Sequence, residues 1–170
     1  YVGANPVMTL FISAAPKIAG LGIFFRLSMA GLFNLLPEIQ MVLALISIIS
    51  ILLGNLSAMV QTDLRRLLAY STIAHMGYTL LGIMAGGKNG QAASLFYILV
   101  YALMTIIAFA TVLIGKGKNA YIFNVSDLKG LSKRSPWLAA MLLIVFFSMA
   151  GVPPTVGFIA KFLVIRSAIN

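Results

Sequence analysis

Residues 92–114 read AASLFYILVYALMTIIAFATVLI, a long apolar run that contains no charged side chain. A helix needs about 20 such residues to cross the roughly 30 Å of hydrocarbon in a bilayer. Membrane-spanning strands are about half as long and alternate apolar with polar residues, which this run does not. The run therefore predicts a transmembrane α-helix.

Four other apolar runs have the same character. They predict membrane spans at about residues 6–30, 37–60, 64–85 and 136–165. Of the 170 residues, 61% are hydrophobic and only 9% are charged, and the mean hydropathy is +1.05. A soluble domain usually carries about a quarter charged residues. We therefore expect an all-α integral membrane protein with five transmembrane helices in one unit, residues 1–170.

Three prolines and one acid mark the expected helix starts. Pro6, Pro37 and Pro136 each open an apolar run, where the missing N–H of proline removes no hydrogen bond. Asp63 precedes the third run and is a candidate N-cap, with its negative charge at the positive end of the helix dipole. These residues predict where the first, second, third and fifth spans begin.

The charges are unbalanced, with 12 Lys and Arg against 3 Asp and Glu, a formal charge of +9. A nucleic-acid-binding protein needs a solvated basic face, whereas most of these cations stand at the ends of apolar runs. Seven lie in the loops at 61–66 and 115–135, and three, Arg26, Lys88 and Arg166, lie on the opposite side. The positive-inside rule predicts that both loops are cytoplasmic.

Loop lengths indicate how neighbouring helices are arranged, and the scarcity of Cys and His excludes several kinds of site. The connections at 32–36 and 86–90 are short, which predicts antiparallel neighbouring helices. The chain has no Cys and a single His, which excludes disulfides, thiolate metal sites and multi-histidine metal sites. Because the chain starts at Tyr1 without a methionine and stops inside an apolar run, we expect a fragment of a longer protein.

Lys17 lies about eleven residues into the first predicted span. A lysine near the bilayer centre costs about 2.5–3.5 kcal/mol on insertion scales, so such a residue suggests a functional site. The alternative is a structural lysine whose ammonium reaches the headgroups. Ser13, in the same segment, is a supporting candidate. We interpret Lys17 as part of an ion pathway.

Lys161 follows a break in the fifth span. Pro153 and Pro154, with Gly151 before them and Gly157 after them, predict a helix that is discontinuous at Gly151–Pro154. Broken helices persist in lipid where the freed backbone faces protein or a water-filled cavity, and they often mark ion sites. A plain kink is the alternative. With a lysine beyond the break, the pattern favours an ion pathway.

His75 is a further intramembrane group that can titrate near neutral pH. Its helix carries Ser71 and Tyr78 on the same predicted face, and the fourth span carries Tyr97 and Tyr101 in a second polar stripe with Ser94 and Thr105. Such stripes can also be ordinary hydrogen bonds between helices. We interpret them as hydrated surroundings for proton exchange.

The acids lie away from these groups. Glu38, Asp63 and Asp127 all belong to span ends or loops. A buried lysine either finds a partner or loses its proton. We therefore expect Lys17 and Lys161 to pair with acids from outside this chain, or to alternate between charged and neutral forms.

Three segments carry a resemblance to a known family: residues 6–19, residues 54–78 with Gln-Thr-Asp-Leu-Arg-Arg-Leu-Leu-Ala-Tyr-Ser, and residues 150–162 with Gly-Val-Pro-Pro-Thr-Val-Gly-Phe. The chain resembles the antiporter-like membrane subunits of respiratory complex I, and within them the subunit N family of bacterial NADH:quinone oxidoreductase. The resemblance covers all 170 residues. It implies a fragment of a fold of about fourteen helices.

The resemblance also implies roles. Lys17 would be the central lysine, Lys161 the exit-side lysine and His75 a residue of the polar axis between them. NADH, FMN, iron–sulfur clusters and quinone would belong to other subunits, so this chain would hold no cofactor. Its partners would be other complex I subunits, its function proton translocation coupled to electron transfer, and its location the bacterial inner membrane, or that of mitochondria.

Three alternatives stay open. A subunit of a multi-subunit cation/proton antiporter or of a membrane-bound hydrogenase would share nearly all these motifs. A structural scaffold whose lysines bind lipid headgroups would tolerate loss of Lys17. The quinone type and the coupling ion do not follow from the residues, beyond a preference for H⁺.

Overall fold

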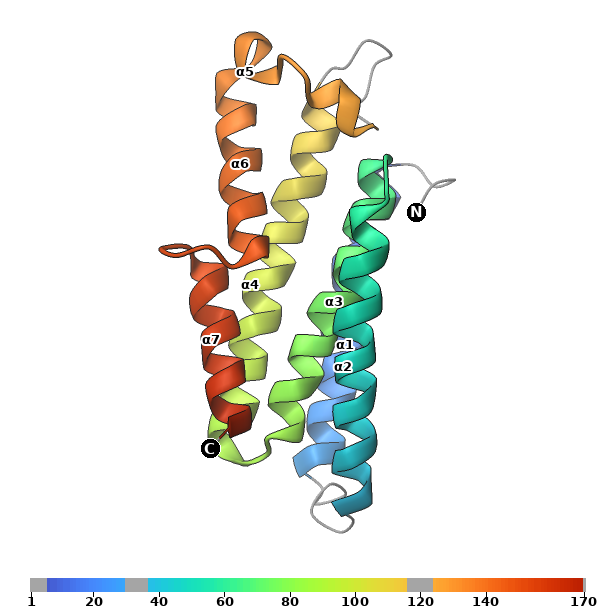
Figure 1. Ribbon diagram of the computed structural model, residues 1–170, viewed down its shortest axis with the longest axis vertical. Helices are drawn as coiled ribbons and strands as arrows, with labels where there is room; N and C mark the ends of the chain where they lie inside the picture. Colours follow the sequence, from blue (N-terminus) through green and yellow to red (C-terminus); the bar gives the residue numbers. More distant parts are fainter. Residues whose placement is uncertain (1–5, 30–36, 116–123, 170) are drawn as a thin grey trace.

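The computed structural model describes residues 6–29, 37–115 and 124–169 of the chain. These residues form an elongated all-helical bundle (Figure 1), without a strand among them. The long helices are α1 (Pro6–Met29), α2 (Pro37–Met59), α3 (Leu64–Met84) and α4 (Gly87–Ile114). A short 3₁₀ turn, η1 (Val125–Leu128), and α5 (Leu131–Arg134) lead into α6 (Pro136–Ala150) and α7 (Val156–Ile169). The predicted helical class is confirmed.

The expected helix starts are confirmed. Helices α1, α2 and α6 begin at Pro6, Pro37 and Pro136. The Asp63 carboxylate accepts hydrogen bonds from the backbone N–H groups of Arg65, at 2.8 Å, and Arg66, at 3.4 Å. Asp63 therefore caps α3 as predicted.

Three helices of the described part are long and apolar enough to cross a membrane: residues Ile39–Met59, Leu64–Met84 and Gly87–Ile114. The break predicted in the fifth run is present, because α6 ends at Ala150 and α7 begins at Val156. Helix α6 lies above α7 in Figure 1, so the two continue one another along the long axis of the bundle. That residues 6–30 and 136–165 also span the membrane stays a prediction, and so does the total of five spans.

One connection was predicted wrongly. The loop expected at 86–90 is shorter, because α4 begins at Gly87 rather than at residue 92. Gly86 and Gly87 both adopt positive φ angles, 68° and 61°, and reverse the chain within two residues. Helix α4 therefore begins directly at this turn. The connection predicted at 32–36 lies outside the described residues.

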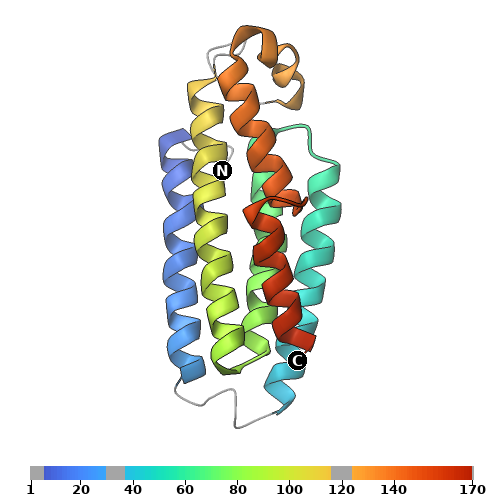
Figure 2. The ribbon, with the colours of Figure 1, turned by 90° about the vertical axis from the view of Figure 1, so that its left-hand side faces the viewer.

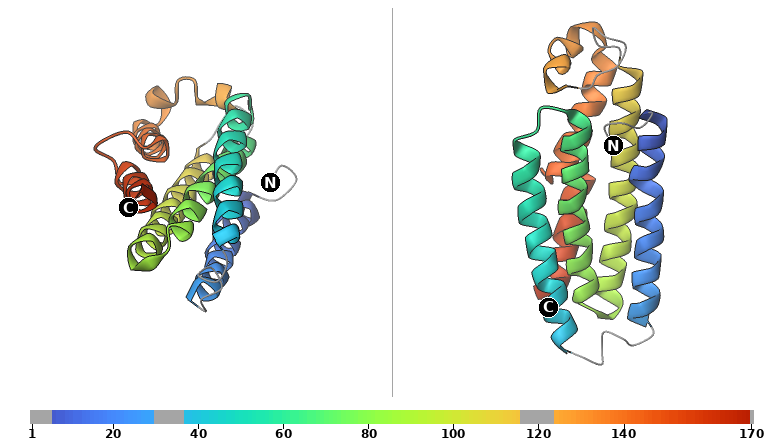
Figure 3. Two further views of the ribbon diagram at one scale, coloured as in Figure 1. Left: turned by 60° about the horizontal axis from the view of Figure 1, so that its bottom comes forward. Right: turned by 90° about the vertical axis from the view of Figure 1, so that its right-hand side faces the viewer.

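Helix α4 is the centre of the bundle. It packs against α1, α3, α6 and α7, as Figures 2 and 3 show from several sides, whereas α2 packs mainly on α3. The largest buried apolar cluster joins α1, α3 and α6 to α4 and includes Leu21, Phe25, Leu68, Tyr101, Phe109, Val145 and Met149. Another cluster joins Ala160 and Val164 of α7 to Ala93 and Tyr97 of α4. Helix α4 therefore positions groups from four other helices relative to one another.

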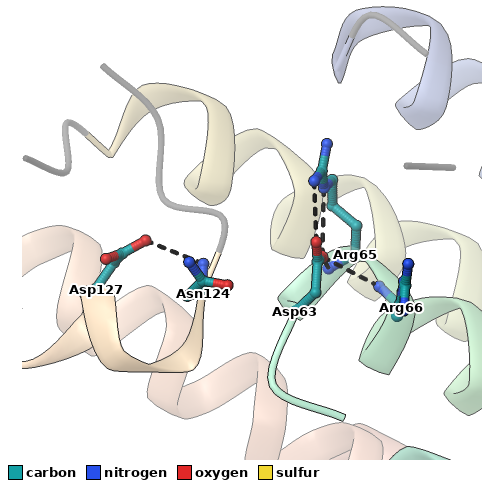
Figure 4. Close-up of polar contacts among 5 residues, drawn as sticks. All are labelled: Asp63, Arg65, Arg66, Asn124 and Asp127. Atoms are coloured by element: carbon teal, nitrogen blue, oxygen red, sulfur yellow. Dashed lines mark hydrogen bonds and ion pairs between the residues drawn. The ribbon is translucent and has the colours of Figure 1, made fainter. Parts of the chain in front are cut away.

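The two cation-rich connections meet at one end of the bundle. The N–H of Val125 donates to the carbonyl of Thr62 at 3.0 Å, and Asp63 faces Asn124 in an isolated antiparallel bridge. Asp63 pairs with Arg65 at 2.9 Å, and Asp127 accepts a hydrogen bond from the backbone N–H of Asn124 (Figure 4). The described parts of both loops therefore lie at the same end of the bundle, as the charge count predicted.

We expect Gly77→Val to destabilise the packing of α3 on α2. A Cβ at Gly77 would lie 2.8 Å from both the Ser47 carbonyl oxygen and the Ile51 side chain. Overpacking of this kind lowers the free energy of unfolding by about 1–3 kcal/mol. The measurement is the Tm of the protein in detergent. Gly20→Ala is the control, because a Cβ there meets nothing within 4 Å; an unchanged Tm for Gly77→Val would contradict the packing.

We expect the Asp63 cap to stabilise α3 in a pH-dependent way. Burial raises the pKa of Asp63, but hydrogen bonds from Arg65 outweigh this and hold the pKa below its ordinary value. The stabilisation is therefore complete above the ordinary carboxyl pKa and is lost as pH falls through the lowered one. Asp63→Ala should lower the free energy of unfolding by about 0.5–2 kcal/mol and remove this acid-dependent part. Asp63→Asn, which keeps a capping oxygen, should lose less; equal losses would show that capping contributes nothing.

Candidate functional site

The ammonium group of Lys17 is directed from α1 towards α3 and α4. Its Nζ donates a hydrogen bond to Oγ1 of Thr72 at 2.9 Å and lies 5.3 Å from the centre of the Tyr101 ring. A cation over an aromatic face is attracted by the ring quadrupole. Lys17 therefore contacts polar groups of two neighbouring helices inside the bundle.

Thr72 joins Lys17 to α4. Its hydroxyl donates to the carbonyl of Leu68 at 2.9 Å and lies 2.7 Å from the hydroxyl of Tyr101. A hydroxyl has one donor hydrogen and two acceptor lone pairs. If Thr72 donates to Leu68, its lone pairs accept from Lys17 and Tyr101, so every hydrogen-bonding position of the Thr72 hydroxyl is used.

His75 lies one turn further along α3 and is only 6% exposed. Its Nδ1 is 2.6 Å from the hydroxyl of Tyr97, and its ring stacks on that of Tyr101 with the centroids 4.4 Å apart. Tyr78 lies next along α3, with its ring 5.9 Å from that of Tyr97. The structure therefore gathers the imidazole and three tyrosines of two helices.

Lys161 approaches the same group from α7. Its Nζ donates to the carbonyl oxygens of Met149, at 2.9 Å, and Ala150, at 3.0 Å, which are the last two residues of α6. The ammonium also lies 5.1 Å from the centre of the Tyr78 ring. The lysine after the break is therefore held by the broken end of the preceding helix.

A small cavity of about 10 Å³ separates His75 from Lys161. Both residues line it, together with Tyr97, Tyr101 and Ser148. A space of this size holds about one water molecule. The Ser148 hydroxyl also accepts the N–H of Gly157 at 3.0 Å, so it ties α6 to α7 beside the cavity.

Together these contacts form a polar line that runs from α1 through α3 and α4 to α7. We call it the lysine–tyrosine line, and its members are Lys17, Thr72, Tyr101, His75, Tyr97, Tyr78 and Lys161. Hydrogen bonds join Lys17 to Tyr101 through Thr72. Another joins His75 to Tyr97, and His75, Tyr101 and Lys161 line the cavity. Such groups can exchange protons.

The other predicted site residues stand apart from this line. Among the described contacts, Ser71 makes none with it, and Pro153 and Pro154 lie exposed in the connection between α6 and α7. The side chain of Ser13 lies outside the described ones. Thr72 was not among the residues predicted from the sequence. Ser71, four residues before His75, and Thr72, three residues before it, both fit the helix face of His75, so spacing alone does not distinguish them.

In the described part of the chain, no carboxylate lies against either lysine. The ion pair there joins Asp63 to Arg65 at the loop end of the bundle. These residues also hold no group of three His, Cys, Asp or Glu that could bind a metal ion. The expectation of acidic partners from outside this chain stays a prediction.

Comparison with known proteins gives the family. All of residues 1–170 match the family described as NADH:quinone oxidoreductase/Mrp antiporter, transmembrane. NADH-quinone oxidoreductase subunit N of Methylovorus glucosotrophus is 48% identical, and that of Nitrosomonas europaea 46% identical, over 170 residues. Each alignment covers 100% of this chain and 35% of the relative. The chain therefore spans about a third of the length of these curated relatives.

Solved structures show the same fold. The Mrp complex from Dietzia sp. DQ12-45-1b matches with a TM-score of 0.83 and 27% identity, over 96% of this chain and 30% of that one. Respiratory complex I from Thermus thermophilus with bound aureothin matches with a TM-score of 0.65 and 37% identity, over 79% of this chain and 29% of that one. The chain therefore belongs to the NADH:quinone oxidoreductase/Mrp antiporter family of transmembrane proteins.

Proposed function

We propose that this chain is part of a membrane subunit of NADH:quinone oxidoreductase and moves protons across the membrane along the lysine–tyrosine line. The observation that carries the proposal is the line itself, which places two lysines and a histidine in one connected polar group inside an apolar bundle. Intramembrane ionisable residues are expensive and usually mark ion or proton routes. The family membership supports the same assignment.

The first part of the route runs from Lys17 to Tyr101. The ammonium donates to Thr72, and Thr72 and Tyr101 are hydroxyl groups that can each accept one proton and release another. The Thr72 O–H first turns from the Leu68 carbonyl towards Tyr101. Thr72 then accepts a proton from Lys17 as its own hydrogen moves to Tyr101, and the hydrogen that Tyr101 held moves to a water molecule in the cavity that Tyr101 lines. Thr72 is therefore a relay between the lysine and the tyrosines.

The second part of the route passes through His75 and the small cavity. One water molecule in the cavity would contact Tyr101, His75 and Lys161, since all three line it. Imidazole can accept a proton at one nitrogen and release it at the other. His75 can thus pass a proton between α4 and α7 without turning its ring.

The driving force comes from outside this chain. Two lysines that share one route influence each other's protonation, so a charge change next to one of them alters both. The redox groups, NADH, FMN, iron–sulfur clusters and quinone, belong to other subunits of the complex. The subunit lies in the bacterial inner membrane with loops 61–66 and 115–135 on the cytoplasmic side, which agrees with the meeting of these loops at one end of the bundle.

A second candidate is a subunit of a cation/proton antiporter. The match to the Mrp complex, with its TM-score of 0.83, favours it. The curated relatives that are 48% and 46% identical over the whole chain are instead named subunits of NADH-quinone oxidoreductase, and they support the first candidate. Proton uptake driven by NADH oxidation would separate the two, because the antiporter does not need NADH.

We expect Lys17→Ala and Lys161→Ala to uncouple proton translocation from electron transfer. Loss of a positioned proton-transfer group lowers a rate by about a hundredfold or more. The measurement is the number of protons moved per electron by the full enzyme in liposomes. The control is Lys88→Ala, because Lys88 is exposed in the first turn of α4 and away from the line. A normal ratio for Lys17→Ala and Lys161→Ala would reject the route, and tolerance of Lys17→Leu would favour the scaffold alternative.

We expect Thr72→Val to slow proton translocation about tenfold, because it removes the hydroxyl between Lys17 and Tyr101 and leaves the ammonium without that hydrogen bond. Thr72→Ser keeps the hydroxyl and should retain most of the activity. Thr111→Val is the matched control, since Thr111 is buried on α4 and donates only to the carbonyl of Ile107 within its own helix. Equal activities of the Val and Ser variants at position 72 would show that the hydroxyl relays nothing.

A further inference from the structure

The end of α6 has four carbonyl groups that no residue within the helix can satisfy. The N–H of Val152 donates to Phe147 at 3.0 Å, and the N–H of Gly151 donates to Ser148 at 3.1 Å. These two bonds form the pattern of a Schellman motif, which requires a left-handed residue after the helix. The motif satisfies the first two carbonyls and leaves those of Met149 and Ala150.

Lys161 satisfies the remaining two carbonyls. Its Nζ donates to Met149 O at 2.9 Å and to Ala150 O at 3.0 Å. The ammonium thus lies at the negative end of the α6 dipole, where a cation is stabilised. The break in the helix therefore provides a cradle of two carbonyls for the lysine of the following half-helix.

Gly151 determines whether Lys161 can reach this cradle. It adopts φ 83° and ψ 40°, in the left-handed region that favours glycine. A Cβ at Gly151 would lie 2.9 Å from Cδ, 3.5 Å from Cε and 3.4 Å from Nζ of Lys161. The lysine stem therefore occupies the space that any other residue at position 151 would need.

We propose that Gly151 is a positioning residue for Lys161: by lacking a side chain it lets the ammonium dock on the carbonyls of Met149 and Ala150, beside the cavity that His75 lines. This inference rests on the proposed function and deepens it, because it names the group that holds Lys161 in place. Hydrogen bonds from a charged donor are stronger than those from a neutral one, so the cradle holds the ammonium more tightly than the amine. Docking of Lys161 therefore depends on its protonation.

The test compares glycine variants in the full enzyme in liposomes. Gly151→Ala should slow proton transfer through Lys161 about tenfold, the effect of losing hydrogen bonds from a charged group, and so lower the number of protons moved per electron. Gly151→Asn should do the same, because asparagine tolerates positive φ but still carries a Cβ. The matched control is Gly130→Ala, since Gly130 has φ 75° and a Cβ there meets nothing within 4 Å. It should leave proton translocation unchanged.

A second readout, the Tm of the enzyme's membrane part, separates positioning from a purely structural role. If the Cβ acts by displacing Lys161, Gly151→Ala should lower the Tm more when Lys161 is present than in the Lys161→Ala background. Equal decreases in both backgrounds, or normal proton translocation by Gly151→Ala, would overturn the proposal. If Gly151→Ala prevents assembly, recovery on adding Lys161→Ala supports it and absence of recovery rejects it.

The Lys161→Ala variant distinguishes a failure of the positioning role of Gly151 from a failure of the proposed function. A normal proton-to-electron ratio in Lys161→Ala would reject the role of Lys161 in the route itself, and with it the positioning role of Gly151. A low ratio in Lys161→Ala together with a normal ratio in Gly151→Ala would reject the positioning role alone.

Discussion

The site is arranged around two ammonium groups that lie inside an apolar bundle, and its other polar groups stabilise them. A buried charge without a partner destabilises a protein by several kcal/mol. In the part of the chain that the structure describes, neither Lys17 nor Lys161 lies against a carboxylate. Lys17 is stabilised by a hydroxyl and an aromatic face, and Lys161 by two backbone carbonyls and an aromatic face. The Thr72 hydroxyl on α3 and the break between α6 and α7 are thus the means by which the fold accommodates charge.

The two ends of the line differ in what holds the lysine. Lys17 depends on a side chain, Thr72, in the middle of the continuous helix α3. Lys161 depends on backbone carbonyls at a helix end, so any movement of α6 relative to α7 changes its hydrogen bonds directly. Backbone dipoles move with the helix that carries them. A conformational signal that reaches the break would therefore act on Lys161 first, and on Lys17 only through the shared route.

Much of this arrangement could be predicted from the sequence, because it follows from local chemistry. The capping by Asp63, the helix starts at proline and the break at Gly151–Pro154 each depend on the backbone properties of a few neighbouring residues. The hydrogen bonds of Thr72 to Lys17 and Tyr101 could not be predicted. Whether Ser71 or Thr72 faces α1 and α4 depends on how α3 is rotated about its own axis, and the sequence does not determine that rotation. The carbonyl partners of Lys161 were also beyond prediction, since a carbonyl carries no residue type that a sequence pattern could reveal.

The size of the cavity between His75 and Lys161 determines which kinds of ion fit there. Between His75 and Lys161 there is about 10 Å³, room for about one water molecule. A hydrated metal cation needs several water or protein oxygens around it and does not fit such a space. A proton needs only groups that accept and release hydrogen, and hydroxyl, imidazole and amine groups supply them along the whole line. The cavity and the groups along the line therefore suit protons better than hydrated metal cations, which agrees with the proposed function.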